Sequence, residues 1–120
     1  MKNFEKIFIF LAIFLSLSES ANSEKISDEK EFLIQIRNHQ FEPAIIEVEA
    51  NQKFKLIVEN LDKTLEEFES SDLKKEKIIG GGKKVSISVS PLKSGEYRFF
   101  GDFHQKTAQG KILVGKVLGK

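Results

Sequence analysis

The chain has 120 residues, which is room for one domain, and its sequence contains neither cysteine nor tryptophan. Without cysteine, a disulfide framework, a thiolate nucleophile and a cysteine zinc site are all excluded. The 19 basic and 18 acidic residues nearly cancel to a net charge of +1, and no stripe of basic residues indicates binding to nucleic acid.

The beginning of the chain has the order of a secretory signal. Lys2 and Lys6 flank the start, an unbroken apolar run covers residues 7–15, and small or polar residues follow. The run falls short of the roughly 20 apolar residues that span a bilayer. We therefore expect a signal peptide over 1–20, a linker over 21–30, and export to the periplasm or the cell exterior with no stable membrane insertion after cleavage. The alternative is an uncleaved membrane anchor, which also places the domain outside the cytoplasm.

The rest of the chain, residues 31–120, has the pattern of successive short strands. Apolar and polar side chains alternate most clearly over residues 85–90, where valine and isoleucine interleave with serine. Turn residues recur at intervals of roughly 8–12 positions, which is typical of a sandwich or barrel. The sequence therefore predicts an all-β domain, with at most one short helical turn near 69–77. Because tryptophan is absent, we expect the large core side chains to be phenylalanines: Phe41, Phe54, Phe68 and Phe99.

Three stretches, in this order, resemble the loops of the cupredoxin family. Residues 38–52 (NHQFEPAIIEVEANQ) are similar to the family's F-x-P-x-x-I-x-V-x-x-G opening, with Asn-Gln in place of the usual glycine turn. Residues 58–68 (VENLDKTLEEF) lie where the family has an asparagine, a short loop and its first histidine ligand. Residues 95–112 (GEYRFFGDFHQKTAQGKI) are similar to the G-x-Y-x-F-x-C-x-x-H … M-x-G-x-I ligand loop. The resemblance covers about residues 31–120 and implies a Greek-key β-sandwich.

More narrowly, three segments resemble the EfeO-type cupredoxin-like domains: EEFESSDLKKEKII, FFGDFH and TAQGKI. Proteins of that type are exported and are often linked to high-affinity iron uptake together with a membrane permease. The resemblance therefore implies an accessory component of iron uptake or copper and iron handling, with an iron permease as its partner.

The family pattern places four residues of this chain at the positions of a blue copper site. Glu66 falls at the first histidine, Gly101 at the cysteine, His104 at the second histidine and Gln109 at the axial methionine. A blue copper centre requires the cysteine thiolate, so this chain cannot form one. The remaining oxygen and nitrogen donors suit copper(II), iron or manganese better than copper(I). We expect Glu66 and His104 to be the main ligands of a non-blue copper or iron site, with four helpers: Asp102, Glu69, Gln109 and His39.

Each of these candidates also has a purely structural interpretation. Glu66 is then an exposed strand residue, Glu69 pairs with a neighbouring lysine, His104 bonds a loop carbonyl and Asp102 caps a turn. The alternative function is a metal-free β-sandwich module that docks on a membrane permease or another envelope partner. Two histidines without a recognisable serine and acid partner do not indicate a hydrolase, while an accessory role in iron oxidation stays open. All metal proposals require that folding brings Glu66 and His104 to the same end of the domain.

Overall fold

The computed structural model describes residues 29–115, and almost all of this part of the chain is strand or turn. The predicted signal peptide and most of the predicted linker lie outside the described residues. Within those described, no helix is long and apolar enough to cross a bilayer. The elements are β1 Lys30–Arg37, β2 Gln40–Glu42, β3 Ile45–Glu49, β4 Phe54–Asn60, β5 Glu66–Ser70, β6 Lys75–Ile79, β7 Lys84–Val89, β8 Gly95–Gly101, the 3-10 turn η1 Asp102–His104 and β9 Gln109–Gly115.

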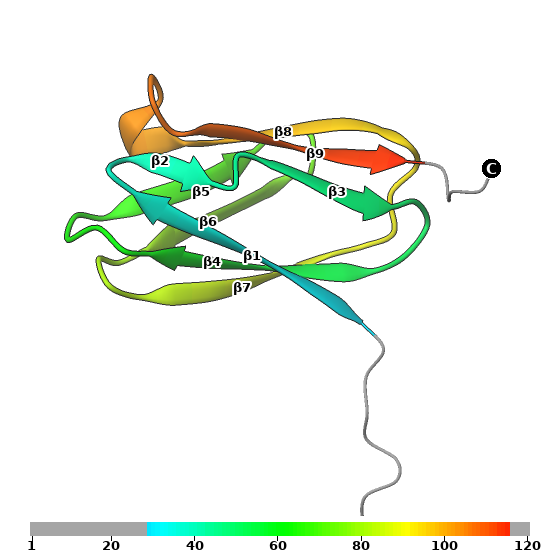
Figure 1. The fold of residues 1–120 in the computed structure, drawn as a ribbon, viewed down its shortest axis with the longest axis horizontal. Helices are drawn as coiled ribbons and strands as arrows, with labels where there is room; N and C mark the ends of the chain where they lie inside the picture. The colour runs from blue at the N-terminus through cyan, green and yellow to red at the C-terminus, as the bar shows by residue number, and fades with distance from the viewer. Residues whose placement is uncertain (1–28, 116–120) are drawn as a thin grey trace, which may run out of the picture.

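The strands form two sheets that pack face to face (Figure 1). One sheet has four strands in the order β2-β1-β4-β7, and the other has five in the order β3-β9-β8-β5-β6. Most neighbours are antiparallel, but β1 runs parallel to β4 and β3 runs parallel to β9. The expected all-β, two-sheet sandwich is therefore confirmed.

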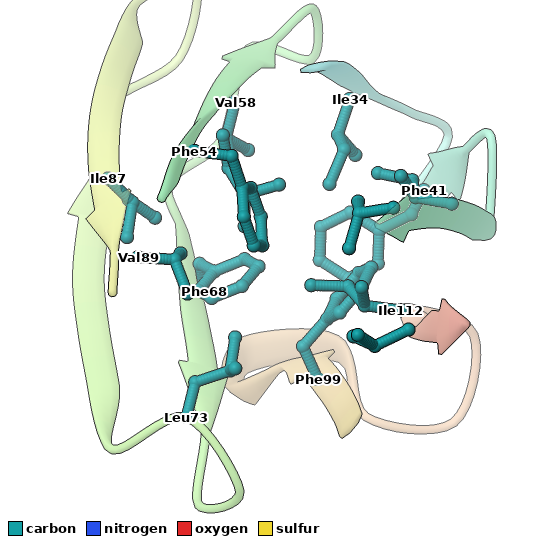
Figure 2. Close-up of a cluster of buried hydrophobic side chains, with 14 of the residues drawn as sticks. Ile34, Phe41, Phe54, Val58, Phe68, Leu73, Ile87, Val89, Phe99 and Ile112 are labelled. Carbon is teal, nitrogen blue, oxygen red and sulfur yellow. The ribbon is translucent and has the colours of Figure 1, made fainter. Parts of the chain in front are cut away.

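The core lies between the sheets because the strands alternate between buried and more exposed residues. In β4 every second side chain, from Phe54 to Asn60, is buried. Figure 2 shows the phenylalanine rings between the two sheets, where Phe68 stacks on Phe99 at 5.1 Å between ring centroids and Phe41 contacts Phe99 edge-on at 5.0 Å. All four phenylalanines that the sequence assigned to the core are buried.

The segment 69–77, for which the sequence allowed at most one short helical turn, is part of a β-hairpin. β5 and β6 pair antiparallel from Glu66↔Ile79 to Ser70↔Lys75, and the four residues between the strands form a turn. The buried Ser70 hydroxyl holds this turn, since it accepts the Leu73 amide at 3.1 Å and donates to the Arg98 carbonyl at 2.7 Å. The strand was difficult to recognise in the sequence because Glu67 and Glu69 on the outer face alternate with only one apolar residue, Phe68, on the inner face.

The loops that follow β1, β4 and β8 gather at one end of the sandwich (Figure 1). This is the end opposite to where β1 begins and β9 ends, at the left of the view. The 3-10 turn Asp102–His104 belongs to the same loop cluster. Residues distant in sequence therefore meet here, as expected for the end of a sandwich.

Candidate metal-binding site

A two-residue turn places His39 at the loop end. β1 and β2 pair up to Arg37↔Gln40, so only Asn38 and His39 connect the two strands. Both have positive φ, 54° and 60°, which is the conformation of the type I′ hairpin turn. Asparagine adopts this conformation readily, whereas histidine does so less often, so other contacts are expected to support the turn.

The support comes from the Asp62 carboxylate in the β4–β5 loop. It accepts the Asn38 amide at 2.8 Å and the His39 amide at 2.9 Å, and His39 Nδ1 lies 3.5 Å from Asp62 Oδ2. Partial burial of the carboxyl group raises its pKa, but the two amide hydrogen bonds and the nearby imidazoles outweigh that effect and hold the pKa of Asp62 below its ordinary 3.8. The carboxylate thus fixes the turn that carries His39.

Glu66, the first residue of β5, is a buried carboxylate with only 1% of its surface exposed. Its Oε1 accepts the amides of Glu67 at 3.0 Å and Phe103 at 2.9 Å, and its Oε2 lies 2.7 Å from His104 Nδ1. Both oxygens of the carboxyl group therefore have polar partners, as the burial of a polar group demands. The short Oε2···Nδ1 contact confirms that Glu66 and His104 meet at the same end of the domain.

The two histidines stack on each other. The ring centroids of His39 and His104 are 3.7 Å apart and the ring planes are within 10° of parallel. The side chain of His39 is 42% exposed and that of His104 is 28% exposed. Within residues 29–115 neither Nε2 atom has a hydrogen-bond partner. The arrangement is a pair of imidazoles, each with Nδ1 facing a carboxylate and Nε2 uncommitted.

Asn60, the last residue of β4, is fully buried. Its side-chain amide donates to the carbonyls of Thr64 at 2.8 Å and Ile79 at 3.1 Å, and its Oδ1 accepts the Asp62 amide at 3.0 Å. Asn60 therefore shapes the loop that carries Asp62 and leads into Glu66. The family resemblance predicted an asparagine and a short loop in this segment but assigned no role to Asn60 or Asp62. The available signal was an asparagine at a buried position of β4 with an aspartate two positions later.

The structure does not bring the other three candidates into this group. The Asp102 carboxylate accepts the Gln105 side-chain amide at 2.8 Å. Gln109 is exposed and donates to the Gln105 carbonyl at 2.9 Å. Glu69 projects from the outer face of β5, away from the core that Phe68 enters.

Glu69 instead belongs to an acidic cluster on the outer face of the β5–β6 hairpin, which comprises Glu67, Glu69 and Glu76. Their carboxylate oxygens lie within 4.8 Å of one another. Desolvation and then the charges of Glu76 and Asp102 raise the pKa values of Glu67 and Glu69 above 4.5. In the part of the chain that the structure describes, none of the three pairs with a lysine or arginine. Exposed acidic groups of this kind are common without a bound ion.

The lowered pKa of Asp62 predicts how its contribution depends on pH. Asp62→Asn is expected to destabilise the domain by about 1–2 kcal/mol at pH 7, because one of the two charge-assisted acceptors of the turn amides is lost. The ionised form is favoured by folding, so this contribution is complete above pH 3.8 and disappears as the pH falls through the lower folded-state pKa. Urea denaturation of both proteins at pH 7 and at pH 3 or below measures the difference. A difference that stays constant across this range would contradict the prediction.

Comparisons with known proteins identify a family model and a relative. The family model for the cupredoxin-like domain matches residues 7–114. The uncharacterized protein RP394 of Rickettsia prowazekii (strain Madrid E) is 47% identical over 107 residues, which is 88% of this chain and 86% of that protein.

Solved structures show the same fold at low sequence identity. Auracyanin A, a "blue" copper protein from Chloroflexus aurantiacus, has a TM-score of 0.61 and 13% identity, covering 71% of this chain and 98% of its own. The metal-binding domain of the Cu(I)-exporting P-type ATPase CopA from Streptococcus pneumoniae D39 has a TM-score of 0.63 and 16% identity, covering 76% and 91%. The cupredoxin-like β-sandwich expected from the sequence is thereby confirmed.

Proposed function

Because the chain belongs to the cupredoxin-like domain family, we propose that it is an exported metal-binding protein that holds copper(II) or iron where His39 and His104 stack. One observation carries the proposal: two imidazoles from separate loops meet at the loop end, each with Nδ1 facing a carboxylate. Metal-ligating histidines commonly have such a carboxylate behind them, which fixes the tautomer and the ring orientation.

A thiolate copper centre does not fit these residues. The chain has no cysteine, and the space above Gly101 is filled, since a Cβ there would come within 2.7 Å of Glu66 Cδ and 2.8 Å of Glu66 Oε2. The blue copper chemistry of some family members is therefore not proposed for this chain.

A site of imidazole and oxygen donors does fit. When Glu66 is ionised, His104 Nδ1 donates its hydrogen to the carboxylate, and Nε2 keeps the lone pair with which imidazole binds a metal. Imidazole suits copper and iron, and carboxylates add attraction for a cation of higher charge. His104 and His39 would hold the ion, while Glu66 and Asp62 orient the two rings. When bound, the ion supplies positive charge and its own redox couple.

Two adjustments to the ligand set expected from the sequence follow from this geometry. We assign Glu66 an orienting role, because its oxygens are already committed to two amides and to His104 Nδ1. The lone pairs of the two rings lie in nearly parallel planes, so one ring has to turn for both to reach one ion. His39 is the freer ring because it is the more exposed of the two.

Calorimetric titration of the chelator-treated protein with copper(II) and with iron tests the proposal. The double variant His39→Gln/His104→Gln is expected to lose at least tenfold in affinity for the bound metal, on the order of the effect of losing a metal-supporting group. The control variant Glu67→Gln/Glu69→Gln/Glu76→Gln removes the acidic cluster and is expected to bind as the unmodified protein does. Affinity that survives the loss of both histidines but disappears with the acidic cluster would refute the histidine site.

The proposal also includes export and a role in iron or copper handling. Export is supported by the order of charged, apolar and small residues in the first 23 positions. The role as an accessory of iron uptake, with a membrane iron permease as its partner, is supported by the resemblance to EfeO-type domains. Cell fractionation with mass measurement of the mature N-terminus tests export, and co-purification with the permease tests the partner.

A metal-free interaction module is the second candidate, and the satisfied Glu66 carboxylate favours it. Hydrogen bonds within the chain connect the segments of the loop end, which gives the domain a defined docking end. A protein that takes up no metal at millimolar concentration, yet co-purifies with a membrane partner, would support this function over the first.

A further inference from the structure

The Glu66 carboxylate joins parts of the molecule that are far apart in the chain. Glu66 begins β5, whereas the Phe103 amide and His104 Nδ1 belong to the turn after β8, 37 and 38 positions later. The carboxylate also bonds the Glu67 amide of its own strand. A single buried side chain thus connects β5 to the loop that carries His104.

The small residues around it make room for this connection. A Cβ at Gly101 would lie 2.7 Å from Glu66 Cδ and 2.7 Å from Ala108 Cβ, and both distances are too short for real contacts. Gly101 has ordinary strand geometry, with Phe68 as its partner on β5. Glycine is therefore needed at this position for space and not for a special backbone conformation.

We propose that Glu66 is a metal-independent clasp that takes the place of the metal–thiolate link at this end of the sandwich. The carboxylate fills the volume over Gly101 and supplies through hydrogen bonds the cross-link between β5 and the β8–β9 loop. Gly101 and Glu66 are consequently a coupled pair, because a side chain at 101 and the carboxylate exclude each other. The clasp does not require a metal, so this proposal can be tested independently of metal binding.

Amide hydrogen exchange in the presence of EDTA tests the clasp directly. Glu66→Ala is expected to accelerate exchange at the Phe103 amide by on the order of tenfold or more, because the amide loses its hydrogen-bond acceptor. The matched control is Glu69→Ala, which removes a carboxylate from the outer face of the same strand and leaves Phe103 exchange unchanged. Unchanged Phe103 exchange in Glu66→Ala overturns the proposal, as does a wild-type loop that becomes protected only when copper is added.

A double-mutant cycle tests the coupling of the pair. The cycle uses Gly101→Ala and Glu66→Ala in the Ala108→Gly background, which removes the other close contact of the new methyl group. Gly101→Ala is expected to lower the urea midpoint strongly when Glu66 is present and much less when it is absent. Additive shifts of the midpoint overturn the proposal. If the triple variant Glu66→Ala/Gly101→Ala/Ala108→Gly does not fold, the exchange experiment is carried out on Glu66→Gln instead. This substitution keeps the Oε1 acceptor and is expected to preserve the protection of the Phe103 amide.

Discussion

Phe68→Ala is expected to destabilise the domain by about 3–5 kcal/mol, the range found when a buried phenylalanine is truncated. Phe68 is fully buried on β5, stacks on Phe99 and meets Phe41 edge-on at 6.2 Å. Removing its ring leaves a cavity between the two sheets and deletes both aromatic contacts. Chemical denaturation monitored by circular dichroism measures the loss.

Phe103→Ala is the matched control for this substitution. The Phe103 ring is 46% exposed, so its truncation is expected to change the free energy of unfolding by less than about 1 kcal/mol. Phe68→Leu is expected to lie between the two, because most of the apolar volume is retained. Equal effects of Phe68→Ala and Phe103→Ala would show that the described packing is not what stabilises the domain.

Asn60→Ala is expected to lower the free energy of unfolding by about 3 kcal/mol, because this one substitution leaves three backbone groups without a hydrogen-bond partner. The carbonyls of Thr64 and Ile79 and the amide of Asp62 each lose a partner. An unsatisfied buried polar group costs about 1–3 kcal/mol, and water reaches some of the vacated space. Thermal denaturation gives the loss of stability.

A second readout separates the effect on the loop from the effect on the whole domain. Because Asn60 shapes the loop that carries Asp62, its replacement is also expected to release the turn with His39 and to change the histidine proton resonances by NMR. Asn60→Asp keeps the Oδ1 acceptor and is expected to preserve the bond to the Asp62 amide while losing both carbonyl contacts. A stable Asn60→Ala protein with unchanged histidine resonances would contradict the role assigned to Asn60.

Most strands and the core were predictable because apolar and polar residues alternate along a strand with a period of two. Alternation in β4 and β7 follows directly from the pleat, and large apolar side chains in the inner phase have to be covered. Phe68 was assigned to the core for a different reason: without tryptophan, phenylalanines have to supply the large core side chains. The hairpin around Ser70 was not predicted. Its many charged residues and its four-residue turn give a sequence that is also compatible with a short helical turn.

The candidate site was predictable only in part. The family pattern placed Glu66 and His104 at the same end, and the two are in contact. It also placed Gln109 at the axial position, yet the buried residue beside Gly101 is Ala108, and Gln109 lies exposed at the start of β9. Loop hydrogen bonds such as those of Asp62 have no period, so their partners are known only once the loops are folded against each other.

The parallel pairing of β3 with β9 has a consequence for how the chain reaches its native state. β3 comes from the first half of the domain, but its hydrogen-bonding partner is the last strand. The amino-terminal strands therefore cannot complete their sheet until the carboxy-terminal segment is available, and such non-local pairing is intrinsically slow. In a nascent chain, β3 would therefore lack its hydrogen-bonding partner until the last strand has been synthesised.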